Sequence, residues 1–194
     1  AGGKGEGSRV ARCVSRAGGR AGKGCLRVLR RSEYPALPWK NGRGIAHQIA
    51  VSPPQAGYDA LDWQVSRPEI GADGPFSRLP GLDRQFMLVS GGGRTLNVRA
   101  PEDGSAFDRA IDSPLEPFAF RGEWDVECVL RDGPVQVFNV MTRRGRAGAR
   151  REIVELTAPR PLAKPADETL VVYVARGPLD TWGSWGKAVL AADD

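Results

Sequence analysis

Apolar and polar residues alternate in short runs along most of this chain. Ile45, His47, Ile49 and Val51 share one face of a period-two pattern, and small or polar residues occupy the other face. Such alternation is typical of a strand with one buried face. The same pattern predicts strands over 45–52, 61–67, 84–89, 95–99, 126–130, 135–141, 152–157 and 169–176.

Turn-forming residues separate these predicted strands. The 25 Gly and 15 Pro of the chain gather in turns such as those at 73–75, 91–93 and 132–134. Amphipathic helical segments do not intervene, which disfavours a parallel α/β fold. We expect an all-β sandwich, jelly roll or barrel, in which the Pro- and acid-rich stretch 101–117 joins two halves at about 32–110 and 111–194.

The net charge of +5 is concentrated at the amino-terminal end. Residues 1–31 contain nine Lys or Arg and one acidic residue, Glu6, so the remainder of the chain is mildly acidic. This composition, with no aromatic residue, predicts a disordered basic tail over 1–31 followed by a β domain over 32–194. Nucleic-acid binding by the tail is the alternative, and it rests on charge alone, so nucleic acid is not the expected partner.

Cysteine and histidine usage limits the metal sites and indicates the compartment. Cys13, Cys25 and Cys128 form no CxxC spacing, which favours a reducing, cytoplasmic compartment without a disulfide framework. His47 is the one histidine, so a centre built on several His ligands cannot form within the chain. We expect no metal, no cofactor and no membrane-spanning helix, since no run of about 18 apolar residues is present.

The first candidate site lies immediately before the strand predicted at 45–52. Trp39 supplies an apolar wall, Lys40 a positive charge and Asn41 an amide, with glycines beside them that allow close backbone approach. These residue types predict a carboxylate site; the alternative is the start of a strand with Trp39 in the core. His47, on the apolar face, is either a ligand-binding or general-base residue in a barrel interior or a hydrogen-bonded core histidine.

Two further segments carry candidate binding residues. Asp73, Phe76 and Ser77 lie in tight turns, where the alternative is hairpin scaffolding in which Asp83 and Arg84 form a local pair. Asn139 is polar among apolar neighbours, so it is either a structural bridge or a pocket group. Arg143 and Arg144 follow the same strand and either grip an acidic ligand or belong to a solvated hairpin.

Four motifs, taken together, resemble the HutD/Ves family across about residues 34–190. They are PWKNGRG at 38–44, ADGPFSRLPGLDR at 72–84, FAFRG at 118–122 and NVMTRRGR at 139–146. The resemblance implies a cupin-type, RmlC-like jelly-roll barrel of two β-barrel halves. It also implies a regulatory protein of histidine utilisation that binds formylglutamate or a similar small acidic metabolite through Trp39, Lys40, Asn41, Asp73, Phe76, Ser77, Asn139 and Arg143.

The family resemblance leaves two functional classes open. The leading hypothesis is a binding protein without catalytic residues. Such a protein is compatible with a monomer or a homodimer. The alternative is a cupin-like enzyme, an isomerase or a metal-dependent oxygenase, that acts on a small acid. Gln48 stands at a position that is commonly Glu in the family, and an amide cannot perform the acid–base work of a carboxylate, which favours the binding protein.

Overall fold

The computed structural model describes residues 26–39, 44–100 and 102–194. Contacts divide the chain into two units, one formed by residues 34–166 and the other by residues up to 33 together with 167–194. This division differs from halves that meet near residue 110, because β10 (Val135–Arg143) pairs with two strands from the first part of the chain.

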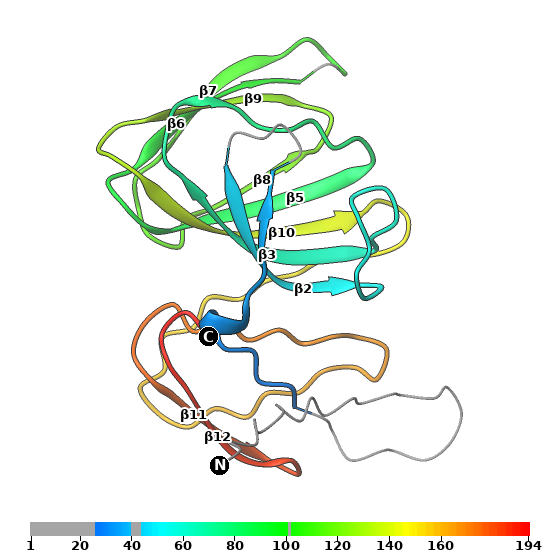
Figure 1. Ribbon diagram of the computed structural model, residues 1–194, viewed down its shortest axis with the longest axis vertical. Coiled ribbons are helices and arrows are strands. Elements are labelled where there is room, and N and C mark those ends of the chain that lie inside the picture. Colours follow the sequence, from blue (N-terminus) through cyan, green and yellow to red (C-terminus); the bar gives the residue numbers. More distant parts are fainter. Residues whose placement is uncertain (1–25, 40–43, 101) are drawn as a thin grey trace, which may run out of the picture. The chain divides into compact units, whose positions relative to one another are not determined.

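The larger unit is built of two antiparallel sheets (Figure 1). The first has the order β1-β2-β3-β10-β5-β8, and its other strands are β1 (Ala36–Pro38), β2 (Ile45–Ser52), β3 (Trp63–Ile70), β5 (Leu82–Ser90) and β8 (Pro117–Arg121). The second has the order β4-β9-β6-β7, with β4 (Gly74–Pro75), β9 (Asp125–Leu130), β6 (Arg94–Arg99) and β7 (Ala106–Ile111).

Both sheets contribute apolar side chains to one core. Leu88 of β5 and Leu96 of β6 are fully buried in the same cluster, so the two sheets enclose a common interior. The cluster consists of Ile70, Phe86, Leu88, Leu96, Val98, Ile111, Phe120, Val126, Cys128, Val135 and Val137. The all-β, cupin-type class is confirmed, and the two sheets of the larger unit enclose one core.

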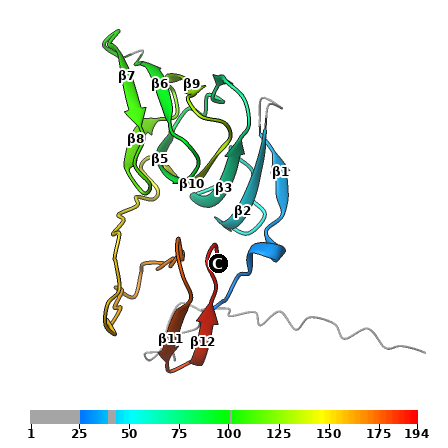
Figure 2. The ribbon, with the colours of Figure 1, turned by 90° about the vertical axis from the view of Figure 1, so that its left-hand side faces the viewer.

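The smaller unit consists of a short 3-10 helix, η1 (Arg31–Glu33), and the hairpin of β11 (Leu179–Gly183) and β12 (Gly186–Leu190), which Figure 2 shows. Arg30 and Arg31 form ion pairs with Asp194 and Asp193. These arginines belong to the segment expected to be a disordered tail. The rest of that segment, residues 1–25, lies outside the described residues.

Six of the eight predicted strands are confirmed, as β2, β3, β5, β6, β9 and β10. The predictions at 152–157 and 169–176 are wrong: no strand forms there, and Ile153, Leu156 and Leu170 are exposed. Alternation shows that a segment suits a strand, but a strand also needs a hydrogen-bonding neighbour. The expected linker 101–117 instead contains β7, which pairs with β6 along its full length.

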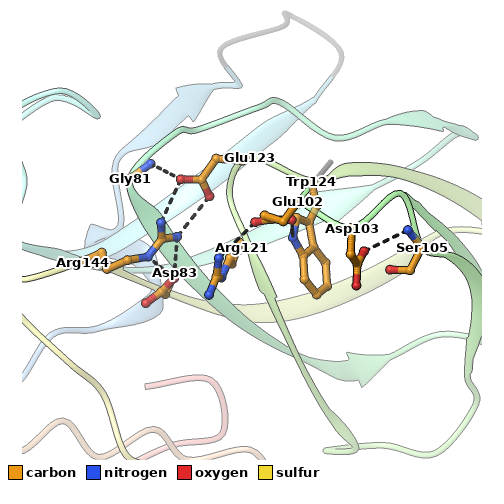
Figure 3. Close-up of polar contacts among 9 residues, drawn as sticks. All are labelled: Gly81, Asp83, Glu102, Asp103, Ser105, Arg121, Glu123, Trp124 and Arg144. Atoms are coloured by element: carbon orange, nitrogen blue, oxygen red, sulfur yellow. Dashed lines mark hydrogen bonds and ion pairs between the residues drawn. The ribbon is translucent and has the colours of Figure 1, made fainter. Parts of the chain in front are cut away.

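A polar clamp joins two of the motif segments, 72–84 and 139–146, to Glu123, which directly follows a third (Figure 3). Arg144 donates to Asp83 Oδ1 from Nη2 at 2.8 Å and to both carboxylate oxygens of Glu123 at 3.0 Å. Glu123 Oε1 also accepts from the backbone N–H of Gly81 at 2.8 Å, in a turn whose φ of 77° favours glycine. Arg144 is therefore a structural residue whose charge is already matched. Asp83 thus pairs with Arg144. The sequence had instead suggested a local pair between Asp83 and Arg84.

A second polar contact in the same view ties the loop before β7 to the end of β8. Glu102 accepts from Arg121 Nη1 at 3.1 Å and from Trp124 Nε1 at 2.8 Å (Figure 3). All of these groups are exposed or partly exposed, so each contact contributes little to stability by itself. Their effect is to fix the loops around the barrel.

We expect the clamp to stabilise the fold in a pH-dependent way. The hydrogen bonds from Arg144, followed by that from Gly81, lower the pKa of Glu123 from 4.5 to about 2. A carboxylate with a lowered pKa stabilises the folded state above its unfolded pKa and loses that effect as pH falls through its folded pKa. Glu123→Gln should therefore lower the unfolding free energy by about 1 kcal/mol at pH 7.

The difference between wild type and Glu123→Gln should disappear between pH 4.5 and about 2, as measured by urea unfolding at each pH. Glu127→Gln, on the exposed side of β9, is the matched control and should leave the free energy of unfolding nearly unchanged throughout. A difference for Glu123→Gln that stays constant down to pH 2 would contradict the assigned ionisation.

Candidate functional site

Polar side chains interrupt the apolar lining of the barrel along two rows of paired residues. Directly paired residues of an antiparallel sheet lie on the same face. One row crosses β2, β3, β10 and β5 and consists of Gln48, Ser66, Asn139 and Phe86. The next row crosses β3, β10, β5 and β8 and consists of Gln64, Met141, Arg84 and Phe120. A patch of amides, a hydroxyl and a guanidinium therefore lies on the inner face.

Arg84 is the charged group of this patch. Its guanidinium lies over the rings of Phe120 and Phe76, with the Cζ atom 4.7 and 5.5 Å from the ring centroids. Nη1 donates to the carbonyl of Ser77 at 3.2 Å, whereas Nε has no hydrogen-bond partner among the described residues. Burial lowers the pKa of Arg84 to about 10, so the group remains positively charged at neutral pH.

Asn139 is the second side chain of the patch whose hydrogen bonding is incomplete. Its side chain is 2% exposed, and its Nδ2 lies 3.5 Å from Ser66 Oγ, which is the upper limit for a hydrogen bond. Within the described part of the chain, Asn139 Oδ1 has no donor. A buried amide oxygen without a donor is unfavourable. The site therefore offers one cation and one hydrogen-bond acceptor to a ligand.

Phe76 joins this patch to the other aromatic residues. Its ring centroid lies 5.9 Å from that of Phe86, and 6.3 Å from those of Phe120 and Trp39. Trp39 and Phe76 also line a cleft of about 230 Å³, together with Ile70 and the segment 72–75. Because drug-sized ligands occupy about 300–1,000 Å³, this cleft suits a smaller molecule.

The structure brings together some of the residues that the sequence singled out. Trp39 and Phe76 meet at the cleft, and Asn139 lies on the inner face. Ser77 contributes its carbonyl to Arg84. Asp73 also lines the cleft, but its Oδ1 accepts from the backbone N–H of Leu130 at 2.8 Å, which matches the hairpin-scaffolding alternative.

Lys40 and Asn41 lie outside the described residues. Their binding roles stay predictions, which rest on the residue types and on the adjacent Trp39 alone.

His47 does not face the interior, so its expected orientation is wrong. It pairs with Ala36 of β1 and Arg67 of β3, and its neighbour Gln48 pairs with Ser66 on the inner face. A register shift between Gln48 and Ala50 changes the face on which the following residues lie. Val51 therefore packs against the core while His47, earlier in the same predicted stripe, lies on the opposite face.

Arg143 has structural partners. Its Nη1 donates to the carbonyl of Pro80 at 3.2 Å, and its Nη2 donates to the carbonyl of Tyr58. These bonds hold two loops against the end of β10. Arg143 therefore has a structural role, and its role in ligand binding stays a prediction.

Sequence reasoning missed Arg84 and Ser66 as site residues. The signal for Arg84 was present, because it shares the parity of Phe86 and Leu88 and so belongs to the buried face of its strand. A pair with Asp83 is excluded by the same parity, since consecutive strand residues point to opposite faces. Ser66 carries no comparable signal in the sequence.

The described residues contain no cluster of three or more His, Cys, Asp or Glu side chains that could hold a metal ion. Within the same part of the chain, no helix is long and apolar enough to cross a membrane.

The chain is similar to known proteins over most of its length. The HutD family model matches residues 31–194. An uncharacterised 21.2 kDa protein of the hutC 3′ region of Pseudomonas putida is 34% identical over 125 residues, which cover 64% of this chain and 62% of that protein. Protein Ves of Citrobacter koseri is 31% identical over 166 residues, which cover 83% of this chain and 76% of Ves.

Solved structures agree with these matches. HutD from Pseudomonas fluorescens SBW25 has a TM-score of 0.51 and 34% identity, over 60% of this chain and 59% of HutD. A conserved protein of unknown function from Pseudomonas aeruginosa PAO1 has a TM-score of 0.50 and 36% identity, over 61% and 57%. The matched part of this chain thus spans less than two thirds of several relatives. With a family model that matches 31–194, and with the four motifs in place, this chain belongs to the HutD/Ves family.

Proposed function

We propose that this chain is a HutD-type binding protein that takes a small carboxylate into its barrel and acts as a regulator in histidine utilisation. The observation that carries the proposal is Arg84, a cation held among aromatic rings with a free Nε and with no carboxylate paired to it in the described residues. A buried charge without an opposite charge is costly, and a ligand carboxylate would offset that cost.

The side chain of Arg84 is partly accessible, which a reversible ligand requires. A carboxylate would accept from Nε and from a terminal nitrogen in the bidentate geometry that guanidinium groups favour. The flat faces of Phe76 and Phe120 fix the plane of the guanidinium and leave its edge for the ligand. The aromatic rings thus orient the cation.

The free acceptor on Asn139 narrows the choice of ligand. Asn139 lies in the row next to Arg84 on the neighbouring strand, so a ligand on Arg84 would place its next group near Asn139 Oδ1. An N–H group adjacent to the carboxylate would satisfy that oxygen. Formylglutamate has this arrangement, because its formylamino nitrogen is bonded to the carbon that carries a carboxylate.

The genomic region for which a relative is named supports the proposed role in histidine utilisation. The protein from Pseudomonas putida is named for the hutC 3′ region, and an acidic intermediate of histidine breakdown is a suitable signal for the state of that pathway. We place the protein in the cytoplasm, where such an intermediate is formed. Lys40 and Asn41 follow Trp39 of the cleft in sequence, and we propose them as further groups for the second carboxylate of the ligand.

Arg84→Gln should abolish most of the affinity for formylglutamate. Loss of a hydrogen bond to a charged group costs about 1.5–3 kcal/mol, which corresponds to a Kd raised about 10- to 100-fold. Calorimetric titration of wild type and variant measures this change. Arg78→Gln, from the same motif but in an exposed ion pair with Asp125, is the matched control and should leave Kd unchanged.

Absence of heat for wild type with formylglutamate, urocanate and glutarate alike would overturn the proposed ligand class. Equal Kd values for wild type and Arg84→Gln, with both folded by circular dichroism, would instead keep the ligand and remove Arg84 from the site. These two outcomes separate the function from its assignment to this residue.

Asn139 should make the protein bind a ligand that has an N–H group more tightly than one that lacks it. Wild type should bind formylglutamate about tenfold more tightly than 2-propylglutarate, which has the same carboxylates and similar size but no N–H. In Asn139→Leu this preference should shrink to near unity, while the affinity for 2-propylglutarate stays similar. A preference of the same size in both proteins, measured by calorimetry, would show that Asn139 does not contact the formylamino group.

A further inference from the structure

A second arginine lies inside the barrel, contributed by the opposite sheet. Arg94 begins β6 and pairs with Ile111 of β7 and Leu130 of β9, which places its side chain on the inner face. It is 0% exposed, and its Cζ atom lies 4.6 Å from the ring centroid of Phe86. Arg94 and Arg84 therefore contact the same aromatic cluster from different sheets.

The guanidinium of Arg94 lacks hydrogen-bond partners. Nε, Nη1 and Nη2 are all buried, and none of them has an acceptor in the part of the chain that the structure describes. Arg84, by contrast, donates to a backbone carbonyl. A cation–π contact stabilises the face of the guanidinium but leaves the five N–H groups at its edge unsatisfied.

Neighbouring ionisable groups do not neutralise this charge. The thiol of Cys128 interacts with Arg94, but burial raises the pKa of Cys128 to about 11, so the thiol is uncharged at neutral pH. Burial lowers the pKa of Arg94 to about 10, which leaves the guanidinium cationic. The nearby Asp112 forms its ion pair with Arg131 at the surface.

Such an arrangement is unfavourable for a purely structural residue. Burial of an unpaired charge costs several kcal/mol, and apolar side chains of similar volume often replace buried ionic groups without loss of stability. An anion beside Arg94 would provide both the missing charge and the missing acceptors. Carboxylates and small inorganic oxyanions match the planar set of donors.

We propose that Arg94 binds a small anion, a carboxylate or an oxyanion, at a position beside Phe86 that is separate from the carboxylate position on Arg84. The anion is either a free ion or the second carboxylate of the ligand proposed above, which would then bind Arg94 in place of Lys40 and Asn41. In both cases, a pair of anionic oxygen atoms accepts hydrogen bonds from the edge of the Arg94 guanidinium. This inference needs only Arg94, so it remains testable if the ligand proposed for Arg84 is wrong.

The test removes Arg84 first, so that any remaining anion effect cannot come from that residue. Thermal unfolding of Arg84→Gln and of the double variant Arg84→Gln/Arg94→Met is followed while sodium formate replaces sodium gluconate at constant ionic strength. Gluconate is too bulky for an enclosed position. The Tm of Arg84→Gln should rise with formate and reach a plateau, as for binding to the folded state. The double variant should show no such plateau, or should need at least about tenfold more formate.

The double variant Arg84→Gln/Arg94→Lys keeps the positive charge at position 94. It replaces the methionine variant in this test if that variant does not fold. Lysine offers a point charge without the planar pair of donors, so the formate concentration at half-saturation should rise about tenfold. The same concentration for arginine and lysine, a plateau retained in the methionine variant, or no plateau in Arg84→Gln would each overturn the proposal.

Glutarate distinguishes the two sources of the anion. If the second acidic group of the ligand occupies Arg94, the half-saturating glutarate concentration of wild type should rise about tenfold in either single variant, Arg84→Gln or Arg94→Met. If a free ion occupies Arg94, Arg94→Met alone should keep the wild-type response to glutarate. Once the formate plateau has shown an anion on Arg94, these two results identify its source, and loss of glutarate binding in Arg84→Gln tests the proposed function separately.

Discussion

The positive charge enclosed by the barrel is the constraint on which the rest of the site depends. Arg84 cannot leave the interior, because its strand parity is that of Phe86 and Leu88, and it has no carboxylate to neutralise it in the described residues. The aromatic rings of Phe76 and Phe120 accept its face, and the carbonyl of Ser77 accepts one N–H. The donor that remains without a partner, Nε, belongs to a cation, and this is the basis of the proposed carboxylate ligand.

The four sequence motifs are understood as parts of this one arrangement. Trp39 from the first motif, Phe76 and Arg84 from the second and Phe120 from the third form a continuous chain of aromatic and cation–π contacts. The fourth supplies Met141, paired with Arg84, and Arg144, whose ion pairs hold the loops outside. Segments separated by up to a hundred residues in sequence therefore meet at one group. The family signature therefore reflects a packing requirement.

Sequence pattern predicted the fold better than the site, for a physical reason. Period-two alternation indicates which face of a single strand is buried, and it located six strands. Alternation does not indicate the register of strand pairing. Because the register shifts beside Gln48, His47 and Val51 lie on opposite faces, and the predicted orientation of His47 was wrong. Alternation also does not report partners, so the segments at 152–157 and 169–176 were assigned to strands that do not form. The convergence of Trp39, Phe76 and Arg84 depends on pairing between distant strands; the motif resemblance brought Trp39 and Phe76 together but did not include Arg84.

The two interior arginines differ in a way that bears on their roles. Arg84 is partly accessible and has one protein acceptor, so its folded state tolerates an empty site and a ligand that comes and goes. Arg94 is fully enclosed and has no hydrogen-bond acceptor among the described residues, so an empty site is far more costly there. A free anion on Arg94 would accordingly be retained for longer and would contribute to stability, whereas exchange at Arg84 would report the metabolite concentration. A barrel with one permanent and one exchangeable anion position would keep a stable interior while its occupancy responds to the cell.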